Sequence, residues 1–176
     1  MTRCAEGAEA IALVAAAQRG DRAAFERLYA IYARLVHGVL IARVPRLDVE
    51  DLLQDVFVQA MERLPSLRDP AAIGAWLCAI ARHRAADHHR RAPAVCELRD
   101  DVAGPDSSAQ GEALEALSVI RALPAAYRDT LVLRLVEGMT GPEIAAATGL
   151  TPASVRVNLH RGMKLLRERL NGRVSR

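Results

Sequence analysis

Residues 137–170, EGMTGPEIAAATGLTPASVRVNLHRGMKLLRERL, predict two helices joined by a tight turn. Thr140 and Glu143 have the three-residue spacing of a capping box at the start of the first helix. Gly149 supplies the left-handed residue with which such a helix ends. Thr151 can cap the second helix, which continues for about five turns. The stretch therefore predicts a short helix, a turn and a long helix.

The long helix separates apolar from basic residues. Steps of three and four predict a buried stripe of Val155, Leu159, Met163, Leu166 and Leu170. The other side begins with small residues and continues with mostly basic ones. Its members are Ala153, Ser154, Arg156, Val157, His160, Arg161 and Lys164. This pattern is typical of a helix-turn-helix whose second helix enters a DNA major groove. The alternative is a helical hairpin with a solvated charged face; the turn chemistry and the charge favour DNA binding.

The rest of the chain predicts an all-α protein with segregated charge. Its 176 residues allow one mid-sized domain or two small ones, and helical periodicity recurs with no strand-like alternation. The net charge is only +3. Residues 48–62 nevertheless hold five acids and no Lys or Arg, whereas residues 151–176 hold seven Lys or Arg and one acid. This asymmetry indicates two partners of opposite charge.

The cysteines and the chain start indicate a cytoplasmic protein. Cys4, Cys78 and Cys96 form no C-x-x-C pair, and an odd number cannot close fully into internal disulfides. Residues 1–9 carry acids and lead to no long apolar run, so we expect no signal peptide and no membrane insertion. Reduced thiols are expected, and a redox role for any of the three stays open.

An acidic helix is predicted over 48–64, after two scaffold helices at 8–18 and roughly 22–43. Asp21 and Asp48 are expected as N-caps. The expected core side of the acidic helix is Val49, Leu52, Leu53, Val56, Phe57 and Ala60. Its opposite side carries Asp51, Gln54, Asp55, Val58 and Glu62. An apolar Val58 among carboxylates is typical of a docking patch with a polar rim, but a solvated acidic face is equally open.

A fourth helix, 70–91, changes character along its length. Its stripe begins as Ile73, Trp76, Leu77 and Ile80 and continues as Arg84, Asp87, His88 and Arg91. Residues 82–91 hold four arginines and three histidines against one acid, so we expect this half to meet phosphate. Asp87 is expected to pair with Arg84 or Arg91.

Residues 92–111 have no helical period and contain turn-forming and acidic residues, which predicts a flexible linker. Ser107 can cap a following helix over 109–122, and Pro124 begins another. Two lobes of about 80 residues bury modest cores, so we expect them to pack on each other or on a partner.

Three motifs in this order resemble an extracytoplasmic-function (ECF, group IV) sigma factor of bacterial RNA polymerase. Residues 48–57 are similar to its core-binding helix, and residues 75–91 to its –10-reading helix. Four short segments resemble its –35-reading domain, namely Leu123-Pro124, Glu143-Ile144-Ala145, Val155-Arg156 and Arg161. The resemblance implies a region 2-like domain over 1–91, a linker over 92–111 and a region 4-like domain over 112–176.

The resemblance also implies a role for each face. The residues Asp51, Gln54, Asp55, Val58 and Glu62 would dock on the β′ clamp of core polymerase. The –10 element would meet Trp76, Arg82, His83, Arg84, Arg90 and Arg91. The –35 element would meet Ser154, Arg156, Val157, His160, Arg161 and Lys164. The β flap and an anti-sigma factor are further implied partners, and the polymerase, not this chain, would perform the chemistry without a cofactor of this chain.

This sequence departs from the family pattern at several positions. His83 stands where Asn is usual, which leaves the –10 preference there in doubt. Gly141-Pro142 replaces the commoner Ser-aromatic pair, and Gly162 replaces Ala in mid-helix, where a glycine could let the helix bend.

Other classes of function fit less of the sequence. A metal site is disfavoured because, of Cys78 and residues 83–89, only His83 and Asp87 share a helix face. A free-standing helix-turn-helix repressor would not explain the acidic helix or the second basic helix. A sigma mimic that titrates an anti-sigma factor should have eroded its basic faces, and both remain. No nucleophile–base pair, P-loop or dinucleotide motif indicates an enzyme.

Overall fold

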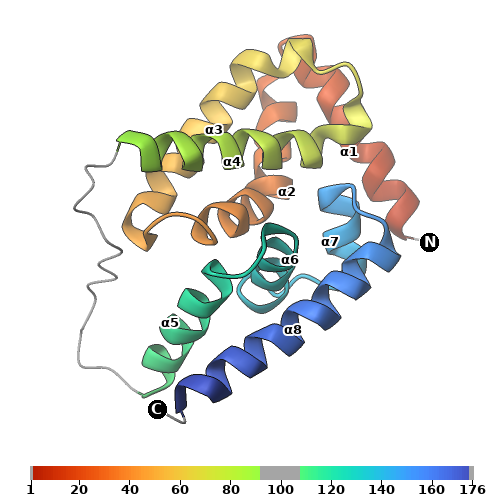
Figure 1. The fold of residues 1–176 in the computed structure, drawn as a ribbon. Coiled ribbons are helices and arrows are strands. Elements are labelled where there is room, and N and C mark those ends of the chain that lie inside the picture. Colours follow the sequence, from red (N-terminus) through yellow and green to blue (C-terminus); the bar gives the residue numbers. More distant parts are fainter. Residues whose placement is uncertain (1, 92–107, 175–176) are drawn as a thin grey trace.

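The computed structural model describes residues 2–91 and 108–174, which form two helical lobes (Figure 1). The first lobe holds α1 (Thr2–Gln18), α2 (Arg22–Ile41), α3 (Val49–Arg63) and α4 (Ile73–Arg91), with 3-10 turns at Arg46–Asp48, Leu64–Ser66 and Pro70–Ala72. The second lobe holds α5 (Ser108–Arg121), α6 (Ala125–Leu135), α7 (Gly141–Thr148) and α8 (Pro152–Val174). The described ranges contain no strand, so the all-α prediction is confirmed. Most of the expected linker, and the expected cap Ser107, lie outside the described residues.

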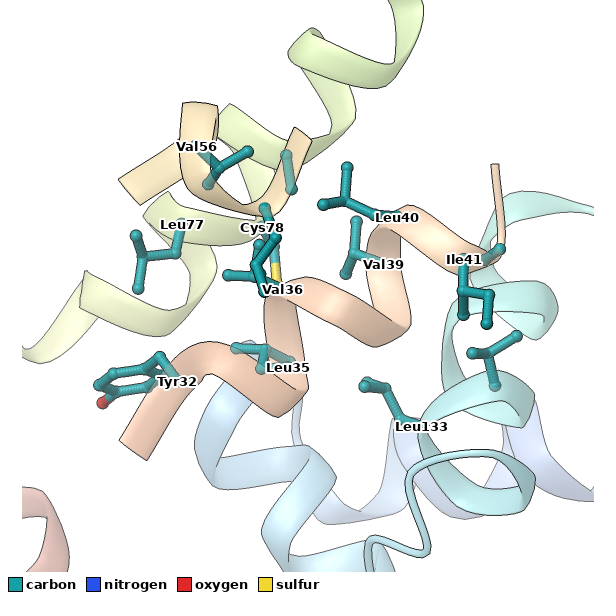
Figure 2. Close-up of a cluster of buried hydrophobic side chains, with 14 of the residues drawn as sticks. Tyr32, Leu35, Val36, Val39, Leu40, Ile41, Val56, Leu77, Cys78 and Leu133 are labelled. Atoms are coloured by element: carbon teal, nitrogen blue, oxygen red, sulfur yellow. The ribbon is translucent and has the colours of Figure 1, made fainter. Parts of the chain in front are cut away.

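Helix α2 is the centre of the first lobe, because α1, α3 and α4 all pack on it. Val36 and Leu40 of α2 are fully buried. Figure 2 shows Val56 of α3 and Leu77 of α4 in the same cluster. The apolar stripe predicted for α3 is buried throughout. Burial of a Val or Leu side chain stabilises a fold by roughly 1.5–3 kcal/mol, so this cluster fixes how α3 and α4 are presented.

The predicted N-caps of the first lobe are confirmed in one case and wrong in the other. The Asp21 carboxylate accepts from Ala24 N at 3.1 Å and caps α2. Asp48 makes no capping bond, because its backbone is already helical in the 3-10 turn before α3. Its carboxylate instead lies 3.2 Å from Nε2 of His88 on α4. Asp48 therefore links the two helices that carry the expected acidic and basic faces.

The helix-turn-helix has the predicted local chemistry. Thr140 N donates to Glu143 Oε2 at 2.6 Å and Glu143 N donates to Thr140 Oγ1 at 3.4 Å, so the capping box is present. The hydrogen bond that the Thr140 backbone donates to the Glu143 carboxyl is the main reason why the pKa of this carboxyl is lowered, and the Thr140 side chain adds to the effect. Gly149 ends α7 with φ +74°, and Ser154 N donates to Thr151 Oγ1 at 3.1 Å. The left-handed backbone of Gly149 thus sets one boundary of the turn, and the side chain of Thr151 sets the other.

Helix α8 packs closely on α6 through Gly162. A Cβ at this position would lie 3.0 Å from Leu131 Cδ1 and 3.2 Å from Tyr127 Cβ. Leu131 is completely buried. We therefore attribute Gly162 to close helix packing rather than to the bend that its sequence position suggested.

The two lobes pack on each other, as their small size led us to expect. Helix α6 lies against α2, and α7 lies against the start of α4 (Figure 1). Leu133 of α6 is fully buried beside the α2 residues drawn in Figure 2. The contact thus continues the first lobe's apolar core into the second lobe.

Candidate nucleic-acid interface

The outer face of α8 is open to solvent. All six residues that the sequence predicted for major-groove contact are exposed, and Val157 exposes 42% of its surface. The reason is the opposite stripe, in which Val155 and Leu166 are buried against the second lobe. In the described part of the chain Lys164 has a weak ion pair with Glu168, at 4.0 Å. Arg156 and Arg161 project from the same face, so cations are presented along it.

The acidic face of α3 is also fully presented. Asp51, Gln54, Asp55 and Glu62 are exposed, and Val58 is exposed by 53%. Met61, exposed by 53%, lies one turn from Val58 and was missed in the sequence reading. Its three-residue spacing from Val58 was the available signal. The two side chains form an apolar patch rimmed by carboxylates, which has the composition of a protein-docking surface.

The six residues predicted on α4 divide into two groups. Arg82, His83, Arg90 and Arg91 are exposed, whereas Trp76 and Arg84 are half-buried. Arg84 Nε donates to Oε1 of the buried Gln59 on α3 at 3.0 Å. The structure thus gives Arg84 a partner inside the lobe, and Gln59 was not singled out from the sequence.

Asp87 pairs with residues other than those predicted. Its carboxylate forms an ion pair with Arg90, and its Oδ2 lies 3.2 Å from His83 Nδ1. The prediction of Arg84 or Arg91 is wrong, because Gln59 engages Arg84. Asp87 therefore holds His83 and Arg90 on one edge of α4, with His83 exposed by 68% of its side chain.

Arg82 is the one α4 cation that reaches the second lobe among the described residues. It lies 3.7 Å from Oδ2 of Asp129 on α6. Arg43, at the end of α2, donates to the same carboxylate at 2.9 Å. Sequence spacing does not predict this cluster, since Arg43 and Asp129 are 86 residues apart.

A side chain of α1 positions the loop before α4. Gln18 Nε2 donates to the carbonyl oxygens of Leu64, at 3.0 Å, and Leu67, at 2.9 Å. Asp69 then accepts from Ala71 N at 3.0 Å and begins the turn that leads into α4. Hydrogen bonds from Gln18 and to Asp69 thus hold the loop that leads into α4.

The described residues contain no group of three or more His, Cys, Asp or Glu side chains placed to hold a metal ion. Cys78 is buried in the first lobe, and burial raises its pKa to about 11, so the thiol stays protonated. The side chains of Cys4 and Cys96 lie outside the described residues. No helix among those described combines the length and the apolar character needed to cross a bilayer.

Comparison with known proteins assigns both lobes. Residues 28–94 match the model of Sigma-70 region 2, and residues 113–166 match that of Sigma-70 region 4. The ECF RNA polymerase sigma factor SigD of Mycobacterium tuberculosis is 34% identical, with 94% of this chain and 85% of the relative covered. The RNA polymerase sigma factor CarQ of Myxococcus xanthus is also 34% identical, with 86% and 91% covered. The chain belongs to the ECF sigma factors.

A solved structure agrees with this membership. CnrH, in its complex with the cytosolic domain of CnrY, is 28% identical and superposes with a TM-score of 0.64, covering 93% of this chain and 98% of CnrH. Helices α3 and α4 fall within the region 2 match, and most of α8 lies within the region 4 match. As an ECF sigma factor, the chain directs RNA polymerase to promoters to initiate transcription.

Proposed function

We propose that this chain is a group IV sigma factor that binds promoters through both of its lobes. Residues 1–91 would bind core polymerase and the –10 element, 92–111 would connect the lobes, and 112–176 would bind the –35 element. The observation that carries this proposal is the pair of exposed faces of opposite charge, acidic on α3 and basic on α8. An acidic docking face suits a basic protein partner, whereas DNA requires the basic one.

The α3 face would dock on the clamp of the polymerase β′ subunit. Val58 and Met61 offer two apolar anchors, and Asp51, Asp55 and Glu62 surround them with negative charge. Such a rim raises the association rate and selects a basic partner, while the apolar centre supplies binding free energy.

The exposed edge of α4 would contact the –10 element. His83 and Arg90 are oriented together by Asp87, and Arg91 continues the edge toward the end of the helix. The half-buried Trp76 offers part of an aromatic ring near the start of the same helix, where an extruded base could stack. All of the bond-making chemistry of transcription would remain with the polymerase.

The α8 face would enter the major groove of the –35 element. Val157 and Ser154 lie near the start of α8, where base edges are usually contacted, while Lys164 lies two turns further toward phosphate. Arg156 and Arg161 have the forked guanidinium that pairs with guanine. We assign base contacts to the part of the face from Ser154 to Arg161 and a phosphate contact to Lys164.

Two protein partners are proposed in addition, one of them at a groove that shares His160 and Lys164 with the DNA-binding face of α8. A groove of about 600 Å³ between α6 and α8 is lined in part by Leu135, Leu159 and Met163, with Leu135 exposed by 49%, and would receive the polymerase β flap. The likeness to CnrH, which was solved with CnrY, supports control by an anti-sigma factor. Both partners would place the chain's activity in the cytoplasm.

A transcription experiment tests the proposal. Purified protein and core polymerase are incubated with fragmented genomic DNA, and the 5′ ends of the transcripts are sequenced. Transcripts that depend on the protein and share spaced –35 and –10 motifs are the expected result. Stable core binding without transcripts would favour a titrating mimic, and absence of core binding would favour a free-standing repressor.

A further inference from the structure

The buried stripe of α3 ends in a polar side chain. Gln59 follows Leu52 and Val56 at steps of four and three residues, and it exposes only 9% of its surface. Burying an amide costs free energy unless its polar atoms find hydrogen-bond partners. Leucine at this position would continue the stripe without that cost, so a glutamine here requires a specific partner.

That partner is Arg84, at which the apolar stripe of α4 also becomes polar. Ile73, Leu77 and Ile80 of this stripe are buried, and Arg84 is its next member, four residues after Ile80. Helices α3 and α4 pack on each other (Figure 1), and Arg84 Nε donates to Gln59 Oε1 at 3.0 Å. The hydrogen bond therefore joins the polar ends of the two stripes.

This hydrogen bond uses one part of the Arg84 guanidinium and leaves the rest available. A guanidinium carries its N–H donors in a planar fork, of which Nε supplies one to Gln59. The donors on Nη1 and Nη2 have no hydrogen-bond or ion-pair partner among the residues that the structure describes, and neither atom is sealed from solvent. Arg84 is only half-buried, so these donors can meet a partner from outside the chain.

The acceptor that holds Arg84 is neutral, which distinguishes this cation from its neighbour on α4. Asp87 places a carboxylate on Arg90 and beside His83, so the positive charge there is partly compensated. Gln59 fixes the direction of the Arg84 guanidinium and leaves its charge whole. A phosphate is attracted by the full charge, and a side chain that is already ordered loses less conformational freedom when it binds.

We infer that Gln59 is a positioning residue for DNA binding, which acts through Arg84 and does not itself touch the nucleic acid. It holds Nε of Arg84, so that Nη1 and Nη2 are presented to a phosphate of the –10 element. The inference rests on the proposed role of α4 in binding that element. It also gives the partner of Arg84 inside the lobe a purpose that is compatible with a DNA contact.

Binding of the full-length chain to a labelled, mixed-sequence single-stranded oligonucleotide tests the inference by fluorescence anisotropy. Gln59→Leu removes the acceptor, and we expect the affinity at low salt to fall roughly three- to tenfold, because one long side chain loses its order. Arg84→Lys keeps the charge but lacks the fork that Gln59 holds, so it should lose as much. Arg22→Lys, at an exposed position in the first turn of α2, is the matched control and should bind like wild type.

A double variant that carries both Gln59→Leu and Arg84→Lys separates positioning from a structural role. If Gln59 acts through Arg84, the double variant binds no more weakly than either single variant, because the two changes remove the same interaction. Gln59→Leu should also melt at or above the wild-type temperature, because an apolar side chain replaces a buried amide. A loss of DNA affinity without a loss of stability then excludes misfolding as its cause.

A charged acceptor provides an independent readout. Gln59→Glu would still accept from Arg84 but would neutralise the guanidinium, so log affinity should fall less steeply with log salt concentration. We expect the slope to change by about 0.7, the value of one phosphate contact on a single strand. Gln59→Leu leaves the charge in place and should keep the wild-type slope.

Three results would overturn the inference: wild-type affinity in Gln59→Leu, additive losses in the double variant, or a wild-type salt slope in Gln59→Glu. The oligonucleotide contains no promoter, so these measurements do not depend on the transcription experiment. If they come out as expected but that experiment yields no promoters, only the proposed function fails. Promoters together with unchanged DNA binding in Gln59→Leu would leave the proposed function intact and remove Gln59 from it.

Discussion

His37 is the residue whose protonation is most directly coupled to the lobe contact. Its Nδ1 faces Glu137 at 2.6 Å, and its Nε2 lies 4.0 Å from Glu50 on α3. The hydrogen bond with Glu137 raises the pKa of His37 above its ordinary 6.5, although burial and the nearby Arg46 act in the opposite direction. Protonation of His37 thus stabilises the contact between the two lobes.

We predict that acid strengthens the lobe contact through His37. A raised pKa contributes stability that is complete below pH 6.5 and is lost as the pH rises through the raised value. Melting temperatures measured from about pH 6 to pH 8.5 should fall more steeply for wild type than for His37→Gln, which cannot titrate. Parallel curves for the two proteins would show that His37 does not supply the dependence.

The residues of the turn show how far local chemistry can be predicted. Thr140, Glu143, Gly149 and Thr151 were assigned their capping roles from spacing alone, and the structure confirms each one. Asp48 was assigned wrongly by the same reasoning, because its backbone is already helical in the 3-10 turn, and its carboxylate pairs with His88, 40 residues away on α4. A cap depends on neighbours within a turn, whereas an ion pair between helices depends on how they pack.

At the scale of the element, α3 yields a charge-reversal prediction. Replacing Asp51 and Asp55 by Lys should abolish binding to core polymerase, because two attractive rim charges become repulsive. Both side chains are exposed, so the melting temperature and –35 DNA binding should stay near wild type. Pull-down of core polymerase measures the effect, and Glu26→Lys, on the exposed face of α2, is the control. If the double variant still bound core polymerase, the exposed face of α3 would be a solvated acidic face and not a docking surface.

Helix α8 yields a prediction about sequence preference. Arg161→Ala should cost about 1–3 kcal/mol on a promoter with its preferred –35 element and much less on a scrambled one. Arg167→Ala, at an exposed position six residues further along α8, is the matched control and should affect binding to both DNAs equally. Competition binding at fixed salt measures the ratio. An unchanged ratio in Arg161→Ala would remove this residue from the base-reading set.

Helix α4 shows where an element's sequence stops being informative. Its change from apolar to basic predicted a second half that leaves the apolar core. Arg82, His83, Arg90 and Arg91 are exposed, whereas Arg84, Asp87 and His88 are half-buried. Its pairing was not predictable, because Arg84 bonds to Gln59 on α3 and Arg82 lies beside Asp129 on α6. Periodicity tells which way a side chain points but not which element comes to meet it.

For the whole molecule, we predict that Asp129 couples the unfolding of the lobes. Asp129→Asn would leave Arg43 desolvated without its carboxylate and should weaken the contact by about 2 kcal/mol, less than for a fully buried pair. Calorimetry should then resolve two transitions where wild type shows one. Glu115→Gln, an exposed acid on α5, should keep the single transition. Two transitions already present in wild type would show that the lobes are not coupled.

The sequence by itself determined the helices, the caps of the helix-turn-helix, the apolar stripes and the two faces of opposite charge. These features depend on side chains within a turn or two of each other, so spacing is enough to predict them. The relation to sigma factors followed from the same local motifs, in their order along the chain.

Only the tertiary structure decided that the lobes close on one another and through which residues. Gly38 faces Leu133, and Arg43 meets Asp129, over separations of about 90 residues that no periodicity records. A glycine within a helix destabilises that helix, and it allows another helix to pack closely only where the fold brings the two helices together. The contact is set by shape and buried charge between distant segments, and such complementarity exists only in the folded chain.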